Sequence, residues 1–386
     1  MRNLILAYER GHHRINVMKK ALESLGQPVI VATDNFDNIK GPFDRIWTLS
    51  ESLLPVQAQL EIKWGINNLS VSAADTLTDK KKFDDFCTKI GLGDLVPKSV
   101  IPTKEEDLFD GNIIVKPTVG SGTKLDGFSY TSYYNTPEML DNAPQDFFDI
   151  NKTGFKDPNF NNVLGYYMVQ EFLPEYSELY APYYYIDGDG KPQYLFGVKL
   201  TQKRTNYGNA KFMVSPKWIE TMPFDEIPTE VSQHFDTFVE YVADVLGVKN
   251  MFLSGPDYYF YDGVVKMIDC NPRIGQGLQI MDKIHDYKLL PSIISGNMIE
   301  IEKHFVWGNT ELKPGKIKNI ADHSHLKKHF SETSHELFSG KIILDQTNVA
   351  DSYFKHCLVV SGKEKPDTLE AYRAIRKELQ DCIEYD

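Results

Sequence analysis

The sequence predicts a mixed fold class, with an α/β part at the N-terminus and α+β parts after it. The chain has 386 residues, of which 41% are hydrophobic and 25% charged, which is typical of a globular protein with two or three domains. The first segment alternates strand and helix patterns, whereas the later segments indicate short strands joined by tight turns. We therefore expect a parallel sheet at the N-terminus and antiparallel sheets beyond it.

The N-terminal segment predicts a β-α-β unit. The apolar runs at 3–8 and 28–33 indicate two strands, and apolar residues at helical spacing from 15 to 25 indicate the helix between them. The turn at 9–13 lacks the GxGxxG pattern that lets a pyrophosphate approach the backbone. A nucleotide is therefore expected to bind elsewhere in the chain.

A helix is predicted from Asp79 to Ile90, with Thr78 as its N-cap. This helix places Lys80 in its first turn, although the helix dipole favours anions at that end. A role of Lys80 in binding a ligand would explain a lysine at this unfavourable position. The alternative is an exposed surface lysine without such a role.

A short apolar strand at 113–116 ends in Lys116 and runs into a glycine-rich turn. The residues of that turn are Gly120, Ser121, Gly122, Thr123 and Lys124. Glycines let consecutive backbone N–H groups converge on anionic oxygens, and the lysines add positive charge, so the segment predicts a phosphate-binding loop. The turn matches neither a Walker A motif nor GxGxxG, and an ordinary loop is the alternative.

The middle of the chain predicts strands at 167–172, 182–186 and 193–200, the last two joined by an Asp-Gly-Asp-Gly turn. Lys199 lies late in the third strand. The polar, basic segment 201–211 is expected to be a loop that closes over an anion.

The last third of the chain predicts a long amphipathic helix at 231–246 and, at its end, a strand at 357–360 followed by a helix at 367–383. His323, His325 and His329 form a histidine-rich cluster between them. We do not interpret this cluster as a zinc site, because no third ligand has the spacing of a helical turn. We assign no role to the long irregular segment 126–165.

The stretch 252–277 gathers carboxylate and amide side chains at one predicted hairpin. A two-residue loop would place Asp257 and Asp269 on opposite faces, whereas a three-residue loop with left-handed Gly263 would place both on one face with Asn271. We predict the three-residue loop, because only this register forms a site of hard oxygen ligands suited to Mg²⁺. A polar hairpin with solvated acids is the alternative.

Over roughly residues 1–300, the order of these pieces resembles the ATP-grasp superfamily. The pieces are Lys80 in TDK, Lys116 in IIVKP, the run GSGTK, Glu171 in VQEF, Glu178, Asp257, and Asp269-Cys270-Asn271-Pro272-Arg273. The resemblance implies an N-terminal α/β domain at 1–77, a small lid domain at 78–170 and a larger antiparallel-sheet domain at 171–386. It also implies that Mg-ATP binds between the lid and the larger domain.

The resemblance assigns roles residue by residue. The residues implied in ATP binding are Lys80, Lys116, Gly120, Ser121, Gly122 and Thr123 at the phosphates, Glu171, Phe172 and Leu173 at adenine, and Glu178 at the ribose. The implied ligands of Mg²⁺, for which Mn²⁺ could substitute, are Asp257, Asp269 and Asn271. Arg273 would hold the phosphoryl group or a substrate carboxylate, and Lys199 would neutralise charge during transfer. Asp269 stands where the family usually has glutamate.

The resemblance implies a ligase that phosphorylates a carboxylate, lets an amine attack the acyl phosphate, and releases ADP and phosphate. Alternatives are a purine-type or carboxyphosphate-forming ligase, and an inactive nucleotide-binding module. The net charge of −12 argues against nucleic acid as a partner. Four cysteines without CxxC spacing and the absence of a long apolar run predict a cytoplasmic protein without a membrane partner. The expected partners are a small carboxylate and a small amine, with a homodimer as the candidate assembly.

Overall fold

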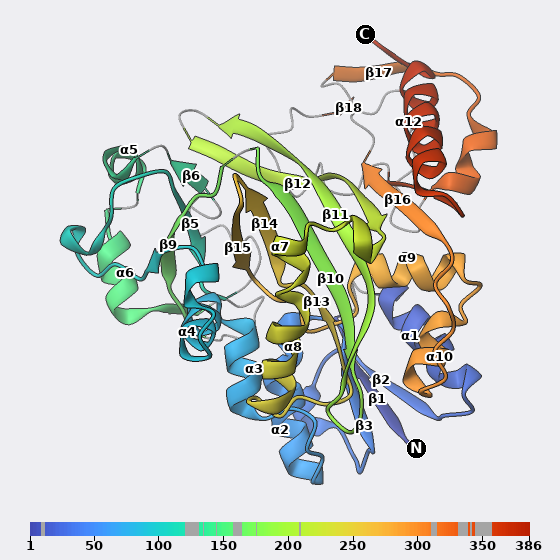
Figure 1. Cartoon of the computed structure of the whole chain (residues 1–386), viewed down its shortest axis with the longest axis horizontal. Coiled ribbons are helices and arrows are strands. Elements are labelled where there is room, and N and C mark those ends of the chain that lie inside the picture. Colours follow the sequence, from blue (N-terminus) through green and yellow to red (C-terminus); the bar gives the residue numbers. More distant parts are fainter. Residues whose placement is uncertain are drawn as a thin grey trace.

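A computed structural model describes residues 1–8, 12–119, 131–133, 135–143, 145–156, 164–174, 176–207, 210–309, 315–330, 339, 342–343 and 357–386. The N-terminal elements lie at the bottom of Figure 1, a smaller group of helices and strands lies to the left, and a long, curved sheet crosses the centre. The predicted mixture of α/β and α+β parts is confirmed.

The N-terminal region confirms the predicted β-α-β unit. Its three strands pair in parallel in the order β2-β1-β3. Leu4, Ile5 and Leu6 are fully buried, as expected for a central strand of a parallel sheet. The elements of this region are β1 (Asn3–Leu6), α1 (His12–Ser24), β2 (Val29–Ala32), β3 (Arg45–Thr48), α2 (Leu54–Trp64) and α3 (Val71–Thr78).

The predicted N-cap of the next helix is wrong by one residue. The helix is α4 (Lys80–Lys89), and Asp79 caps it by accepting hydrogen bonds from the backbone N–H groups of Lys81 (2.9 Å) and Lys82 (3.0 Å). Thr78 is instead the last residue of α3, where its hydroxyl donates to the carbonyl of Ala74. A carboxylate is the stronger cap here because it also interacts favourably with the helix dipole.

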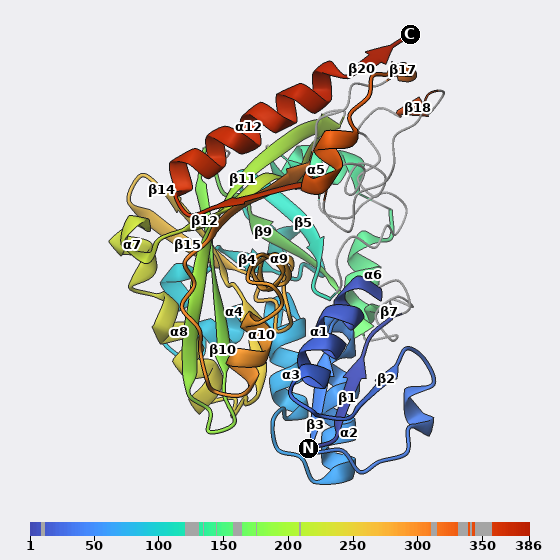
Figure 2. The same cartoon turned by 90° about the vertical axis from the view of Figure 1, so that its right-hand side faces the viewer.

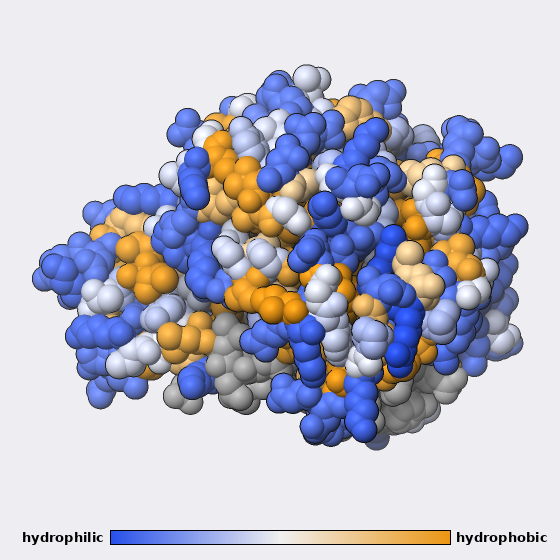
Figure 3. Space-filling model, turned by 90° about the horizontal axis from the view of Figure 1, so that it is seen from below, coloured by the Kyte–Doolittle hydropathy of each residue, from blue (hydrophilic) through white to orange (hydrophobic). Residues whose placement is uncertain are grey.

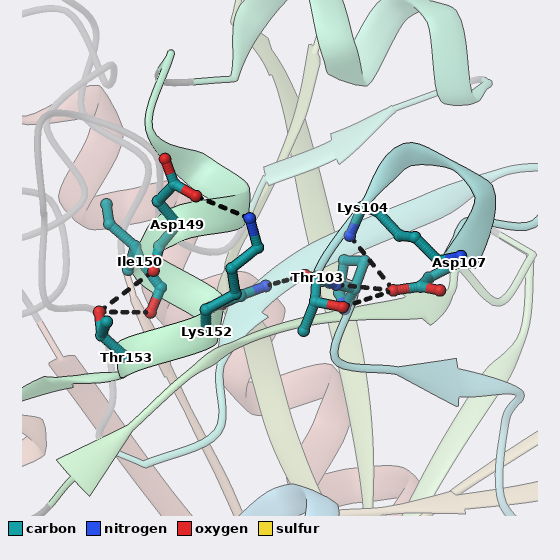
Figure 4. A network of polar contacts seen from close by, with 9 residues as sticks. Thr103, Lys104, Asp107, Asp149, Ile150, Lys152 and Thr153 are labelled. Carbon is teal, nitrogen blue, oxygen red and sulfur yellow. Dashed lines mark hydrogen bonds and ion pairs between the residues drawn. The ribbon is translucent and has the colours of Figure 1, made fainter.

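The region that follows forms the small group at the left of Figure 1. Its strands β4, β5 and β9 pair antiparallel, and Lys116 of β5 lies opposite Met168 of β9. A short turn is held by the Asp107 carboxylate, which accepts from the backbone N–H (2.8 Å) and hydroxyl (3.0 Å) of Thr103, as Figure 4 shows. The elements are β4 (Ser99–Val100), β5 (Ile113–Pro117), β6 (Thr131–Tyr133), α5 (Thr136–Asn142), α6 (Phe147–Thr153), β7 (Phe155–Lys156), β8 (Leu164–Gly165) and β9 (Tyr167–Glu171).

The long sheet has the strand order β15-β14-β10-β11-β12-β6-β5-β9-β4. The expected loop at 201–211 is wrong, because β11 extends to Tyr207 and β12 begins at Ala210. Thr201, Thr205 and Tyr207 have high strand propensity, whereas the prediction of a loop relied on the charged residues of the segment. The strands are β10 (Glu178–Ile186), β11 (Pro192–Tyr207), β12 (Ala210–Met222), β13 (Met251–Ser254), β14 (Asp257–Tyr261), β15 (Val264–Ile268), β16 (His304–Asn309) and β19 (Cys357–Gly362).

Helices cover both faces of this sheet. One core joins the sheet to α1, α9 (Gln276–Ile284) and α10 (Leu289–Ile294). The other core joins it to α3, α4 and α8. The predicted single helix at 231–246 is two helices, α7 (Thr229–Ser232) and α8 (Phe235–Asp244). On the face seen in Figure 3, hydrophobic side chains lie interspersed among hydrophilic ones.

The C-terminal segment confirms the predicted strand and helix. Strand β19 pairs with β16, and α12 (Lys365–Asp381) lies across the sheet in Figure 2. Nearby, β17 (Gly315–Ile320) pairs with β18 (Ile342–Ile343) and β20 (Ile383–Tyr385). His325 contacts Glu378 of α12 at 2.6 Å, and the described part of the chain holds no group of three or more His, Cys, Asp or Glu side chains placed to bind a metal. Of the helices within the described ranges, none is both long and apolar enough to span a bilayer.

Candidate active site

A pocket of about 150 Å³ lies where the N-terminal region, the start of α4 and the end of the β14-β15 hairpin meet. Its polar lining brings together five residues that the sequence singled out, and four further ones. The five are Lys80, Asp257, Asp269, Asn271 and Arg273, and the four are Glu51, Thr78, Asp79 and Cys270. Segments more than 200 positions apart in the sequence therefore form one site.

The loop length and strand register of the β14-β15 hairpin differ from the prediction. Tyr261 pairs with Val264 and Asp257 with Ile268, so the loop contains two residues, and the predicted three-residue loop is wrong. Gly263 is left-handed as predicted, with φ of 78°, but Asp262 is left-handed too, with φ of 48°. These values match the type I′ turn that suits a two-residue hairpin.

Strand alternation alone would then direct the side chains of Asp257 and Asp269 to opposite faces. The alternation ends at Ile268, because Asp269 has a φ of 41°. Its carbonyl still accepts a hydrogen bond from the Asp257 N–H (3.3 Å), and Asn271 pairs again with Ser254. One left-handed residue at the strand end thus replaces the extra loop residue and brings both carboxylates to the pocket.

Lys116 reaches the pocket from β5. Its side chain is 3% exposed, and its ammonium group lies 3.3 Å from Oδ1 of Asp269. Burial alone would raise the pKa of Asp269, but the charges of Lys116 and Lys80 lower it below its usual value. Both lysines therefore act on the same carboxylate, from two different elements of the fold.

The second carboxylate has the opposite shift. Burial, together with repulsion from Asp269, raises the pKa of Asp257 to about 7, and Lys116 offsets this only in part. Two carboxylates that repel each other in a partly buried site favour a bound cation. Together with the amide oxygen of Asn271, they form a set of hard oxygen donors.

Arg273 connects the hairpin to the N-terminal region. Its Nε and Nη2 atoms lie 2.8 Å and 2.7 Å from Oε1 of Glu51, and Nη2 donates to Oδ1 of Asn271 at 3.1 Å. Glu51 begins a short 3₁₀ turn after β3. Glu51 was not predicted from the sequence, because a single glutamate in a polar segment carries no local pattern.

Backbone hydrogen bonds of Thr118 connect the segments that carry Lys80 and Lys116. Its carbonyl accepts from the Lys80 N–H (2.8 Å), its N–H donates to the Tyr166 carbonyl (2.8 Å), and its hydroxyl accepts from the Tyr166 N–H (3.2 Å). Thr118 is fully buried. The start of α4 is thereby attached to the end of β5, two residues after Lys116.

The predicted adenine-binding residues lie at the end of β9. Leu173 is buried against Leu179 and Tyr259, with Ile268 packed on the same cluster. Glu171 accepts from the backbone N–H of Lys98 at 3.4 Å. The Phe172 N–H donates to the carbonyl of Asn112 at 2.8 Å. This apolar cluster adjoins the hairpin strand that leads to Asp269.

The structure does not bring Lys199 and Glu178 into the pocket. Lys199 pairs across the sheet with Tyr180, and Tyr180 pairs with Tyr258, so these three side chains share one face. Asp257, next to Tyr258, faces the other side. The ammonium group of Lys199 binds the Glu178 carboxylate, and this contact lowers the pKa of Glu178 although burial alone would raise it. The predicted roles of Lys199 and Glu178 at ATP therefore stay predictions.

The predicted phosphate-binding loop, Gly120, Ser121, Gly122, Thr123 and Lys124, lies outside the described residues. Before this gap the described chain continues past Pro117 to Val119, and the carbonyl of Thr118 accepts from the Lys80 N–H.

No protein-family model and no curated protein matches the sequence. The fold, in contrast, matches solved structures over the whole chain. An L-amino acid ligase from Bacillus licheniformis has a TM-score of 0.70 and 16% identity, with 100% of this chain and 98% of that chain covered.

Two further structures contain a bound nucleotide. N5-carboxyaminoimidazole synthetase from Staphylococcus aureus, complexed with ADP, has a TM-score of 0.62 and 13% identity, covering 97% of this chain and 96% of that one. The biotin carboxylase domain of 2-oxoglutarate carboxylase from Hydrogenobacter thermophilus, in complex with MgADP, ADP and bicarbonate, has a TM-score of 0.60 and 12% identity, covering 100% and 90%. At these identities, the likeness establishes the fold.

Proposed function

Because the chain has the ATP-grasp fold, we propose that it is an ATP-dependent carboxylate-amine ligase that forms an amide bond through an acyl phosphate. One observation carries the proposal: Lys80, Asp257, Asp269, Asn271 and Arg273 line a single pocket, and Lys116 contacts Asp269 there. Full-length similarity to an L-amino acid ligase supports an amino acid as one of the substrates.

The pocket fits a divalent cation on the chemistry of its donors. Asp257, Asp269 and Asn271 supply three oxygen ligands. Burial, and then repulsion from Asp269, raises the pKa of Asp257, so a cation beside it would stabilise its charged form. When bound, Mg²⁺ would supply charge neutralisation at the phosphates of ATP. Lys80 and Lys116 would orient those phosphates, and Arg273 would hold the acid.

In the proposed reaction, a carboxylate oxygen of the acid attacks the γ-phosphorus, and the bond from that phosphorus to ADP breaks. The amine nitrogen then attacks the acyl carbon, the carbon-oxygen bond to phosphate breaks, and the nitrogen loses a proton to solvent. No side-chain nucleophile is required, so the residues act by positioning and by charge stabilisation.

A second candidate function is a purine-type or carboxyphosphate-forming ligase, favoured by the similarity to N5-carboxyaminoimidazole synthetase. The test is ADP and phosphate release with Mg²⁺ over a grid of free amino acids, in pairs, beside bicarbonate with aminoimidazole-type amines. Release that depends on two amino acids supports the first function, and release that depends on bicarbonate supports the second. ATP binding in calorimetry without release in any well would identify an inactive nucleotide-binding module and contradict both.

A further inference from the structure

A buried tyrosine of the central sheet lies against the segment that leads from the hairpin into α9. Tyr183 of β10 is 5% exposed, and its ring stacks on Phe196 of β11 with the ring centroids 4.5 Å apart. Its hydroxyl oxygen accepts a hydrogen bond from the backbone N–H of Gly277 at 3.3 Å. Tyr183 is not among the residues that line the pocket, so it lies behind the pocket wall.

Two glycines allow this close approach. A Cβ atom at Gly275 would lie 2.8 Å from the Tyr183 ring, and one at Gly277 would lie 2.6 Å from the Tyr183 hydroxyl oxygen. Both distances are too short for nonbonded atoms, so a side chain at either position would displace Tyr183 or the start of α9. Gly275 is also the N-cap of α9 and has no side chain that could cap the helix. The Tyr183 hydroxyl therefore serves the first turn of α9 in place of a capping side chain.

Tyr183 also borders the strand that pairs with Asn271. Tyr183 pairs with Ser254 of β13, and Ser254 exchanges two backbone hydrogen bonds with Asn271, at 2.9 Å and 2.8 Å. The Asn271 carbonyl also accepts from the N–H of Arg273 at 2.8 Å. The segment 271–277 is thus held at one end by Ser254 and at the other by the Tyr183 hydroxyl, and these two residues are neighbours in the sheet.

The Tyr183 hydroxyl is neutral at physiological pH. Burial raises its pKa, and the Ser254 side chain and the Gly277 N–H oppose this rise only in part. A neutral hydroxyl can accept a hydrogen bond from Gly277 without adding a charge beside the carboxylates of the pocket. Its effect on the pocket is therefore one of geometry.

We propose that Tyr183 is a positioning residue for Asn271: by holding the start of α9, its hydroxyl fixes the segment 271–277 and thereby the place of the Asn271 amide oxygen relative to Asp257 and Asp269. The inference rests on the proposed function, which takes these three residues as ligands of Mg²⁺. Mg²⁺ demands near-ideal octahedral geometry at short distances, so a small shift of one ligand weakens its binding. Loss of the hydroxyl should therefore weaken Mg²⁺ binding although no ligand is removed.

The first test measures ATP binding by calorimetry at a series of Mg²⁺ concentrations. Tyr183→Phe removes only the hydroxyl and should raise the Mg²⁺ concentration for half-maximal ATP binding about two- to tenfold, as expected for the loss of one neutral hydrogen bond. At saturating Mg²⁺, ATP affinity should stay within about twofold of the wild-type value.

Tyr184→Phe is the matched control for this test. Tyr184 is the next residue of β10, and its hydroxyl donates to Asp236 at 2.6 Å in the core on the other face of the sheet. Because this hydrogen bond goes to a carboxylate, Tyr184→Phe should lower the melting temperature at least as much as Tyr183→Phe. It should leave the Mg²⁺ dependence of ATP binding unchanged.

The second test combines Tyr183→Phe with Gly277→Ala. The added Cβ atom should displace the Tyr183 hydroxyl, so Gly277→Ala alone should also raise the Mg²⁺ requirement. Since both changes break the same contact, the double variant should lose less Mg²⁺ affinity than the sum of the two single losses.

The third test uses Mn²⁺ without nucleotide, followed by electron paramagnetic resonance. Mn²⁺ should bind the wild-type protein and Tyr184→Phe equally, and Tyr183→Phe more weakly. This result without any ATP binding or ADP release would refute the proposed ligase but support the positioning role.

Three results would overturn the inference. The first is an equal Mg²⁺ requirement in the wild-type protein and Tyr183→Phe, or an equal rise in Tyr184→Phe. The second is a double variant whose loss of Mg²⁺ affinity equals the sum of the single losses. The third is a wild-type protein that binds neither Mn²⁺ nor Mg²⁺ with ATP.

Discussion

Replacement of Lys116 by methionine tests whether this buried lysine serves the nucleotide. The substitution keeps most of the apolar stem and removes the ammonium group that lies 3.3 Å from Asp269. At an effective dielectric constant of about 20, the attraction across that distance is about 5 kcal/mol, and the desolvation of the lysine cancels much of it. Because the Asp269 side chain is 30% exposed, we expect the free energy of unfolding to fall by about 2 kcal/mol.

The larger effect should be on ATP. A charge-assisted hydrogen bond to a phosphate contributes about 1.5–3 kcal/mol, so Lys116→Met should weaken ATP binding roughly ten- to a hundredfold. Calorimetric titration with ATP and Mg²⁺ measures this change. Arg273→Ala should leave ATP affinity within about twofold, because Arg273 is proposed to hold the acid.

A matched control exists on the hairpin. Lys266 of β15 donates to the backbone carbonyls of Asp94 (2.8 Å) and Val96 (3.3 Å), away from the pocket. Lys266→Met should lower the melting temperature and leave ATP affinity intact. Unchanged ATP affinity in Lys116→Met, or an equal loss of affinity in Lys266→Met, would show that Lys116 does not bind the nucleotide.

Three further substitutions test other parts of the structure. Asp269→Glu should lower the free energy of unfolding by about 1 kcal/mol, because a longer side chain tolerates the left-handed backbone less well. It should still keep more of the Mg²⁺-dependent ATP affinity than Asp269→Asn does, and equal Mg²⁺ titrations of the two variants would contradict this. Gly263→Val should lower the free energy of unfolding by about 1–2 kcal/mol through backbone strain alone, because no atom lies within 4 Å of the added Cβ; urea unfolding measures it, and an unchanged midpoint would count against the left-handed turn. Burial raises the pKa of Asp282 to about 6, although a hydrogen bond from the backbone N–H of Leu290 partly opposes the shift. Asp282 therefore binds a proton more tightly in the folded state than in the unfolded state. The free energy of unfolding should fall by up to about 3 kcal/mol as the pH rises from 4 to 7, because this preference for the folded state is then lost. Asp282→Asn should remove this part of the pH dependence, and identical pH profiles for both proteins would exclude it.

The sequence predicted the members of the site better than their geometry. Lys80, Lys116 and Asp257 were identified because each belongs to a short pattern of strand, helix start or turn. The hairpin register was predicted wrongly, since strict alternation was assumed through Asp269. Aspartate tolerates left-handed backbone better than most residues, but nothing in the local pattern marked this position as left-handed.

Other parts of the site were beyond sequence reasoning for a physical reason. Glu51 is positioned by a tertiary contact, because it meets Arg273 across 222 positions of the chain. The segment 201–211 was expected to be a loop because of its charges, whereas pairing between β11 and β12 makes it part of two strands. Such long-range pairing overrides local polarity.

The hydrogen bond from the Lys80 N–H to the Thr118 carbonyl does not depend on which side chains surround the pocket. It sets the spacing of Lys80 and Lys116 through main-chain atoms, which every residue except proline supplies at position 80. Side chains around the pocket can therefore be exchanged while this link between the start of α4 and the end of β5 is kept. If the two lysines bind ATP as proposed, related chains with different side chains around the pocket should keep the same main-chain spacing of the two ATP-binding segments.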